Sequence, residues 1–217
     1  MKLRNLKLIL SIVIIFVSFI LAIYLYPQMP FMMVTHWGID NQPNGYSTKN
    51  FALFFMPILS IFLLGLFLFL PKIDPYKNNF KQFSQYYDSF ILLMLSFLFY
   101  IYVLSLFWNL NYRFNMIQLL SPALAAMYFY AGVLTSKAKR NWFVGIRTPW
   151  TMSNETVWQR THQIGSKLFK FTGVIALLSI FWPQFSIFLI LIPVLISSIF
   201  VFVYSYWEYR KIIFKKI

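Results

Sequence analysis

The densest group of residues that could do chemistry lies in the stretch 141–162, where a guanidinium, a carboxylate and an imidazole occur among tryptophans. Arginine, glutamate and histidine together could bind an anion or transfer a proton. The candidate binding residues of this stretch are Asn141, Gly145, Arg147, Thr148, Pro149, Trp150, Glu155, Trp158, Thr161 and His162.

Local sequence signals predict a helix in the second half of this stretch. Pro149 disfavours a helical conformation at Thr148. Either Thr151 or Ser153 could then cap a helix that begins near Asn154.

On that helix Glu155, Trp158 and His162 are spaced i, i+3 and i+7, so they share one face. Gly145 would let the chain bend before Arg147, and we expect the guanidinium to reach Glu155 as an ion pair. The alternative is an amphipathic interfacial helix whose tryptophans rest among lipid headgroups while its basic residues meet anionic lipid. The residues alone do not separate these interpretations.

A second group lies between residues 27 and 50, with candidate binding residues Pro30, His36, Trp37, Asp40, Gly45 and Tyr46. The prolines and glycines here impose turns and predict a compact loop. His36 and Asp40 could hold a metal ion if they shared a helical turn, but two ligands make a weak site. We therefore expect a surface histidine and no metal. Trp37 and Tyr46 suit contact with a peptide and burial among headgroups equally well.

The composition indicates which elements must position these groups. Hydrophobic residues make up 60% of the 217-residue chain and charged residues 11%, against roughly 25% charged in soluble domains. A bilayer core needs about 20 apolar residues per helix. Four uncharged runs of this kind occur, at Leu8 to Tyr26, Phe51 to Leu70, Ser89 to Leu110 and Met116 to Thr135.

The last uncharged run, Phe171 to Trp207, would be about 55 Å long as one helix, nearly twice a bilayer core of roughly 30 Å. We predict a break at Trp182-Pro183, with a fifth helix from about Ser166 to Trp182 and a sixth from about Phe185 to Trp207. The first run lacks a small-residue cleavage site, so we expect a retained helix rather than a signal peptide.

The basic residues predict the orientation. A net charge of +14 could indicate nucleic-acid binding, but the basic residues lie between apolar runs. In the six-helix arrangement all 19 Lys and Arg except Lys49 and Arg113 fall on one side, including Lys2, Lys215 and Lys216. By the positive-inside rule both termini are cytoplasmic. We expect a multi-pass protein of the cell membrane, with membrane lipids as partners and no direct contact with nucleic acid.

The predicted fold class is therefore an all-α polytopic membrane protein of about six transmembrane helices. Residues 1–70 would form a two-helix unit with the outer loop 27–50. Residues 71–217 would form a four-helix unit with a short basic loop at 71–88 and the inner loop 136–165.

This topology excludes several chemistries. His36 and His162 fall on opposite sides of the membrane, so they cannot share a site. The chain has no cysteine, which excludes thiolate catalysis and disulfides. All five acidic residues lie in predicted loops or at helix ends, whereas proton-coupled transporters usually carry one inside the membrane. We expect no cofactor and no enzymatic activity.

The stretch Asn141 to Thr151, followed by Glu155 and by Trp158-Gln-Arg-Thr-His162, resembles the signature of SdpI-type immunity proteins. The outer loop, with Pro30, the run 35–37 and Gly45, is similar to the small N-terminal domain of unknown function that precedes it in that family. The resemblance covers nearly the whole chain. One departure is the segment Gly132 to Lys137, which lacks a Gly-Asn pair often present there.

The resemblance implies a receptor-like membrane protein that protects a cell from a secreted toxic peptide on its outer face. It also implies a cytoplasmic repressor protein as a partner that the immunity protein captures. Two alternatives stay open: a small-solute or lipid transporter, and a membrane-bound enzyme that uses Arg147, Glu155 and His162.

Overall fold

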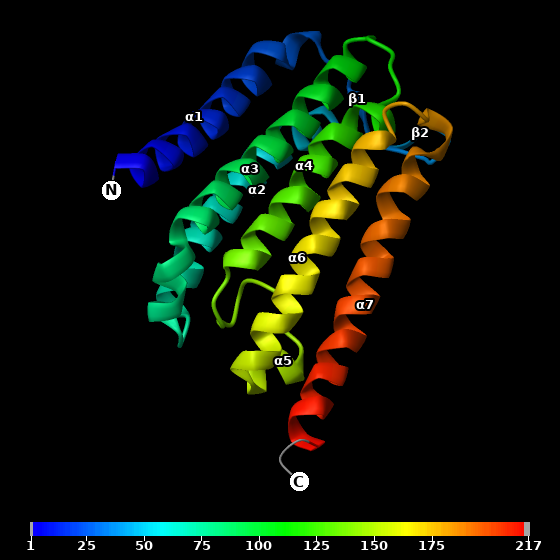
Figure 1. The fold of residues 1–217 in the computed structure, drawn as a ribbon. Helices are drawn as coiled ribbons and strands as arrows, with labels where there is room; N and C mark the ends of the chain where they lie inside the picture. The colour runs from blue at the N-terminus through cyan, green and yellow to red at the C-terminus, as the bar shows by residue number, and fades with distance from the viewer. Residues whose placement is uncertain (1, 215–217) are drawn as a thin grey trace.

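The structure, a computed structural model that describes residues 2–214, is a bundle of long helices with one small β-hairpin (Figure 1). The long helices are α1 (Lys2–Leu25), α2 (Lys49–Ile73), α3 (Lys77–Asn109), α4 (Met116–Lys137), α6 (Glu155–Leu178) and α7 (Ser186–Phe214). The short elements are the 3-10 turns η1 (Tyr26–Gln28) and η2 (Pro183–Phe185), the strands β1 (Met32–Trp37) and β2 (Pro43–Thr48), and α5 (Pro149–Ser153).

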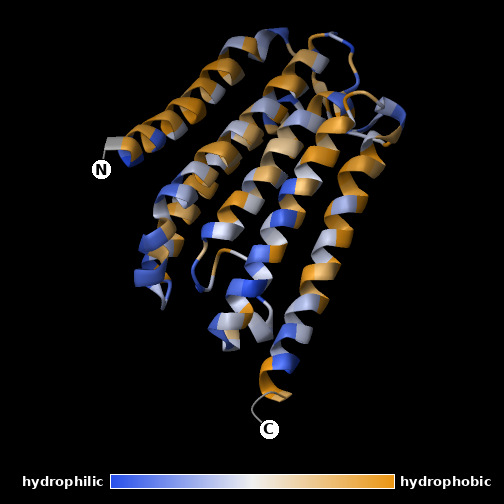
Figure 2. Ribbon diagram, viewed as in Figure 1, coloured by the Kyte–Doolittle hydropathy of each residue, from blue (hydrophilic) through white to orange (hydrophobic). Residues whose placement is uncertain are grey.

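The predicted class, an all-α membrane protein with several spans, is confirmed. Five helices, α1, α2, α3, α4 and α7, are long and apolar enough to cross a bilayer. The sixth long helix, α6, lies alongside α4 and α7; its first half is polar and its far end is apolar (Figure 2). Successive long helices alternate in direction, so the start of α1 and the end of α7 point toward the same end of the bundle (Figure 1).

The predicted break in the last apolar run is also confirmed. The chain leaves α6 at Leu178, makes η2 at Pro183 and enters α7 at Ser186. The boundaries of the fifth helix were wrong, because it begins at Glu155 rather than near Ser166. The polar start of α6 is helical because it packs on neighbouring helices, a tertiary effect that hydropathy does not register.

The predicted basic loop at 71–88 is mostly helix. After Ile73 only a tight turn separates α2 from α3, which begins at Lys77. Phe80, Phe83 and Tyr87 lie on one face of α3 and are buried together. This i, i+3, i+7 spacing is an amphipathic helix signal, which Lys81 and the other polar residues between them obscured.

Small residues let α6 pack tightly on α4. A Cβ on Gly132 would lie 2.7 Å from the carbonyl oxygen of Ser166, and one on Gly173 would lie 2.7 Å from that of Ala125. Backbones therefore touch directly, as in membrane helix pairs that lack bulky side chains between them. A hydroxyl pair, Thr172 with Ser197 at 3.0 Å, joins α6 to α7.

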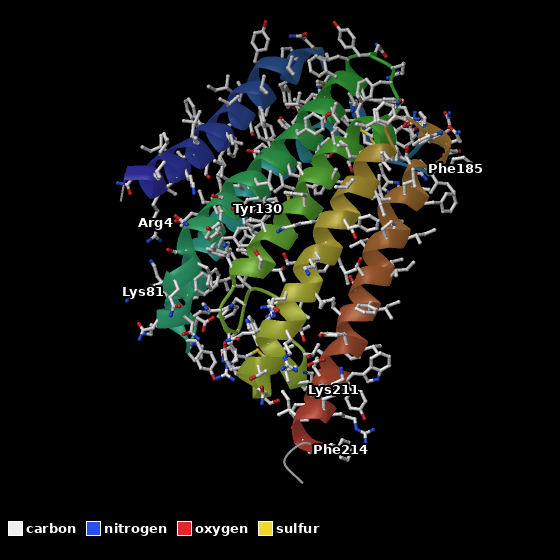
Figure 3. The ribbon with its side chains drawn as sticks, viewed as in Figure 1. Arg4, Lys81, Tyr130, Phe185, Lys211 and Phe214 are labelled. Atoms are coloured by element: carbon white, nitrogen blue, oxygen red, sulfur yellow. The ribbon has the colours of Figure 1, made fainter. Side chains whose placement is uncertain are left out.

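The two ends of the bundle differ in charge. The labelled residues Arg4, Lys81 and Lys211 lie toward the end that holds the start of α1 and the end of α7, and Phe185 lies at the opposite end (Figure 3). We call the first the basic end and the second the hairpin end, because β1 and β2 lie there. Lys215 and Lys216, both counted in the charge pattern, lie outside the described residues.

The predicted compact outer loop is an antiparallel hairpin of β1 and β2. Asn109 at the end of α3 accepts from the Val34 N–H at 2.8 Å and donates to the Val34 carbonyl at 3.0 Å, as a neighbouring strand would. At the hairpin turn Asn41 accepts from the Met116 N–H at 2.6 Å. The hairpin is thus fastened to α3 and to the start of α4.

Candidate functional site

The candidate site at the basic end is built around the loop 138–148, which connects α4 to α5. Asn141 is fully buried, and its amide donates to the carbonyls of Lys139 and Val144, both at 2.8 Å. Its oxygen accepts from the backbone N–H of Phe143 and of Val144, at 2.9 and 2.7 Å. All four hydrogen-bonding positions of the amide are used, so Asn141 shapes the loop.

A second buried side chain, Asp74, fastens this loop to the turn between α2 and α3. Its carboxylate accepts from the backbone N–H of Tyr76 at 2.6 Å and of Trp142 at 3.0 Å. Asn79 adds a bond from its amide to the carbonyl of Arg140 at 2.9 Å. Asp74 was not among the predicted site residues, although a single carboxylate between an apolar run and lysines was an available signal.

At the centre of the site Gly145, Trp158 and His162 form one contact group. Gly145 has φ +114°, and a Cβ there would overlap Nε2 of His162 and lie 3.2 Å from the Trp158 ring. The Trp158 and His162 rings stack with centroids 3.9 Å apart. Trp158 also donates from Nε1 to the carbonyl of Ala138 at 3.0 Å. Only glycine fits at position 145, because this backbone conformation disfavours side chains and no space remains for one.

Both ring nitrogens of His162 are engaged. Nε2 accepts from the Ile146 N–H at 3.1 Å, so Nδ1 carries the proton that it shares with the Trp158 carbonyl at 2.8 Å. Burial lowers the pKa of His162 to about 4, although the bond to Trp158 opposes this. The imidazole is therefore neutral at physiological pH and holds the loop onto α6.

Thr148, Pro149 and Trp150 join this loop to α7. Thr148 caps α5, accepting from the Thr151 N–H at 3.2 Å, and Thr151 Oγ1 accepts from the Thr148 N–H at 2.9 Å. The Thr148 hydroxyl also donates to Ser205 on α7 at 3.0 Å. Pro149 occupies the first position of α5, where no N–H is needed.

Trp150 packs against two aromatic rings of α7, those of Phe202 at 5.3 Å and Tyr206 at 5.0 Å between centroids. Trp150 therefore links α5 to α7. Thr161 is fully buried, and its hydroxyl has no hydrogen-bond partner among residues 2–214.

The expected ion pair between Arg147 and Glu155 was wrong. Glu155 instead faces Arg140, with Nε and Oε2 3.5 Å apart, and Arg147 donates to the carbonyl of Trp142. The reason is the turn at Gly145, which directs the exposed Arg147 away from the start of α6. Glu155 is also exposed, so it does not share the buried face of Trp158 and His162.

The cap of α6 also differs from the prediction. Asn154 is the N-cap, accepting from the N–H groups of Thr156 and Val157, whereas Thr151 and Ser153 belong to α5. A further ionic contact that we did not predict joins α6 to α7. Buried Glu208 accepts from Arg160 at 2.8 Å and from Lys211 at 3.0 Å.

Some of the residues proposed in the outer loop form contacts within the hairpin, and others are exposed at its surface. His36 pairs with Asn44, and Asp40 accepts from the Gln42 N–H at 3.1 Å, so the two do not converge. A Cβ on Gly45 would lie 2.8 Å from the Cβ of His36. Within the described residues, no cluster of three or more ligand-type side chains is present.

The other residues of this group differ in exposure. Pro30 is exposed just before β1, and Tyr46 is 57% exposed. Trp37 is partly buried and packs edge-on against Trp108 with ring centroids 5.6 Å apart. Trp37 is therefore packed into the fold, whereas Tyr46 lies at the surface.

Comparisons with known proteins confirm the resemblance that the motif indicated. The model of the SdpI/YfhL protein family matches residues 137–205, and that of a domain of unknown function, DUF1648, matches residues 13–61. The immunity protein SdpI of Bacillus subtilis (strain 168) is 29% identical over 208 residues, which cover 95% of this chain and 97% of that protein. No solved structure matches the chain significantly.

Proposed function

Because this chain carries the SdpI/YfhL region at residues 137–205, we propose that it is an immunity protein of the cell membrane that protects against a secreted, membrane-active toxic peptide. The observation that carries this proposal is the end-to-end similarity to an immunity protein, which covers 95% of this chain. The proposal takes the basic end as cytoplasmic, as the positive-inside rule predicts.

The geometry supports a receptor or binding role for the motif better than a catalytic one. The three residues considered for catalysis have separate partners. His162 forms hydrogen bonds with Ile146 and Trp158. Glu155 faces Arg140, and Arg147 donates to the carbonyl of Trp142. A general base must reach its substrate's proton, and both nitrogens of this imidazole are used in the fold. Leu95, near the middle of α3, is fully buried among apolar side chains, which favours a packed bundle over the transporter alternative.

We propose in addition that the surface of the loop 138–148 contacts a cytoplasmic partner, as the resemblance implies for a repressor. This proposal is supported by the loop's combination of a buried residue that fixes its shape and exposed residues that could contact a partner. Asn141 is buried, while Trp142 is 51% exposed and Arg147 lies beside it. An exposed tryptophan next to an arginine is a composition typical of binding hot spots.

Deletion of the gene tests the main proposal. Cells that lack it should become sensitive to the conditioned medium of the parent strain grown under peptide-producing conditions, and expression of the wild-type chain should restore protection. Medium treated with protease is the control for a peptide agent. Equal survival of deletion and parent strains in active medium would refute the immunity role.

A further inference from the structure

A polar pocket opens at the basic end, between the end of α4 and the start of α6, two helices that lie side by side (Figure 1). Its volume is about 230 Å³, which leaves room for a phosphate group, since one water molecule occupies roughly 30 Å³ in the liquid. Its polar wall consists of Ser136, Lys137, Lys139, Gln159 and Gln163. Within residues 2–214 no carboxylate lines this pocket, so its charge is positive. We call it the basic pocket.

The two lysines supply the charge of the basic pocket. Both Lys137 and Lys139 are exposed. The ammonium of Lys137 lies 5.6 Å from the ring centroid of Tyr86, and this cation–π contact leaves its N–H groups free to donate to an anion. The rings of Trp158 and His162 complete the wall, and their nitrogens are bonded within the fold. The lysines and glutamines are therefore the groups that can receive a ligand.

Two glutamine amides stand beside the lysines. Gln159 donates one N–H to Glu155 at 3.3 Å and keeps the other for a ligand. Glu155 is opposed by Arg140 at 3.5 Å, so it does not cancel the charge of the lysines. Gln163 lies one turn further along α6 and carries two amide N–H groups of its own. Ammonium and amide donors around one space suit the charged oxygens of a phosphate.

An apolar groove continues between α4 and α6 toward the middle of the bundle. Its volume is about 370 Å³, and its walls include Ala125, Ala126, Phe129, Gly173 and Val174. Phe129 and Val174 are 46% and 50% exposed, so the groove opens outward. Because α4 is long and apolar enough to span a bilayer, the medium outside this groove is the acyl chains of lipids.

The basic pocket and the apolar groove lie on one side of the α4–α6 pair. On α4, Phe129 and Ser136 are spaced i, i+7 and share a face. On α6, Gln163, Lys170 and Val174 are spaced i, i+7, i+11 and also share a face. Lys170 packs against α4 between the pocket and the groove, where a lysine directs its ammonium toward lipid headgroups.

The separation of the two features matches a lipid molecule. From Gln163 in the pocket to Val174 in the groove, α6 rises about 16 Å at roughly 1.5 Å per residue. One leaflet of a bilayer core is about 15 Å thick, half of the roughly 30 Å of the whole core. A phosphate in the basic pocket and an acyl chain end in the groove are therefore one lipid length apart.

We infer that the basic pocket binds the phosphate of an anionic phospholipid of the cytoplasmic leaflet, and that one of its acyl chains lies in the apolar groove. A soluble phosphate would use the pocket alone and leave the groove to other lipids. A zwitterionic headgroup would bring a second cation close to Lys137 and Lys139. This site involves no toxic peptide, so it goes beyond the proposed function.

Native mass spectrometry of the full-length chain in detergent tests the site. The probes are dioleoyl phosphatidylglycerol and dioleoyl phosphatidylcholine, which share their acyl chains and differ in the net charge of the headgroup. The first molecule of phosphatidylglycerol should bind with a Kd about tenfold or more below that of phosphatidylcholine, because two lysines face its charge. Glycerol 3-phosphate, which has no acyl chain, should not displace it at equal concentration.

A charge variant and its matched control report on the basic pocket. The double variant Lys137→Gln, Lys139→Gln should raise the Kd for phosphatidylglycerol about tenfold and leave that for phosphatidylcholine unchanged. The double variant Lys77→Gln, Lys81→Gln removes two exposed lysines of the basic end that do not line the pocket. It has the same net charge as the first variant and should bind phosphatidylglycerol as the wild type does.

A steric variant and its control report on the apolar groove. Ala126→Phe places a ring in the groove and should raise the Kd for phosphatidylglycerol several-fold. Ile196→Phe adds a ring on α7 at a side chain that is 62% exposed and does not line the groove. It should leave that Kd unchanged.

Three results would overturn the lipid site. Equal Kd values for the two lipids, or equal effects of the two double lysine variants, would remove the anionic headgroup from the basic pocket. Displacement by glycerol 3-phosphate as effective as that by phosphatidylglycerol would make the pocket a site for soluble phosphate. If the Lys137 and Lys139 variant fails to fold, equal binding to Ala126→Phe and Ile196→Phe would still refute the acyl chain in the groove.

Discussion

Gly145 gives the sharpest test of how the candidate site is built. In Gly145→Ala the new Cβ would overlap Nε2 of His162 and lie 3.2 Å from the Trp158 ring, at a residue with φ +114°. The backbone strain should cost about 1–2 kcal/mol. Displacing His162 should break its bond from the Ile146 N–H, a further loss of about 1 kcal/mol.

The unfolding free energy should therefore fall by about 2–3 kcal/mol, which for a chain of this size lowers Tm by about 5–10 °C. The measurement is thermal unfolding of the purified variants in one detergent. Gly65→Ala is the matched control, because a Cβ there meets nothing within 4 Å. Position 65 lies inside α2, so alanine should be neutral or stabilise by up to about 1 kcal/mol.

A double-mutant cycle separates the two contributions. In a His162→Ala background there is no imidazole for the new Cβ to overlap and no hydrogen bond from the Ile146 N–H to lose. Gly145→Ala should then lower the unfolding free energy only by the backbone strain, about 1–2 kcal/mol. The reasoning is refuted if Gly145→Ala is as stable as Gly65→Ala. Equal costs in the two backgrounds would show instead that His162 plays no part.

Three further predictions concern the pH dependence, the packing and the topology. The pKa of His162 falls from 6.5 to about 4 on folding, so between these pH values only the unfolded chain binds this proton. Acidification from pH 7 to pH 4 should therefore reduce the unfolding free energy of wild type, relative to that of His162→Gln, by about 3 kcal/mol. Parallel stability–pH curves for the two proteins would exclude this. Gly173→Leu should separate α4 from α6 and lower the unfolding free energy by about 3 kcal/mol or more. Gly65→Leu should cause neither change. Equal melting temperatures for the two variants would contradict the close packing of α4 on α6. Since the chain has no cysteine, single cysteines report sidedness directly: a membrane-impermeant maleimide added to intact cells should label Thr48→Cys but not Ser153→Cys, and the reverse pattern would invert the predicted orientation.

The sequence alone determined the membrane class, the break near Pro183 and the motif between residues 141 and 162. These depend on composition, run length and residue identity, which need no knowledge of neighbours. The need for a bend at Gly145 and a helix beginning near Asn154 could also be predicted, because turn and cap preferences are local.

Only the tertiary structure decided which side chains meet. Arg147 and Glu155 are compatible in charge, yet the turn at Gly145 separates them, and Arg140 takes the place beside Glu155. Asp74 and Glu208 each also bind one residue that is distant in sequence, Trp142 and Arg160 respectively, and no local pattern assigns these partners. Local propensities act over a few residues, whereas these contacts exist only after the helices have packed, and α6 becomes a long helix for the same reason.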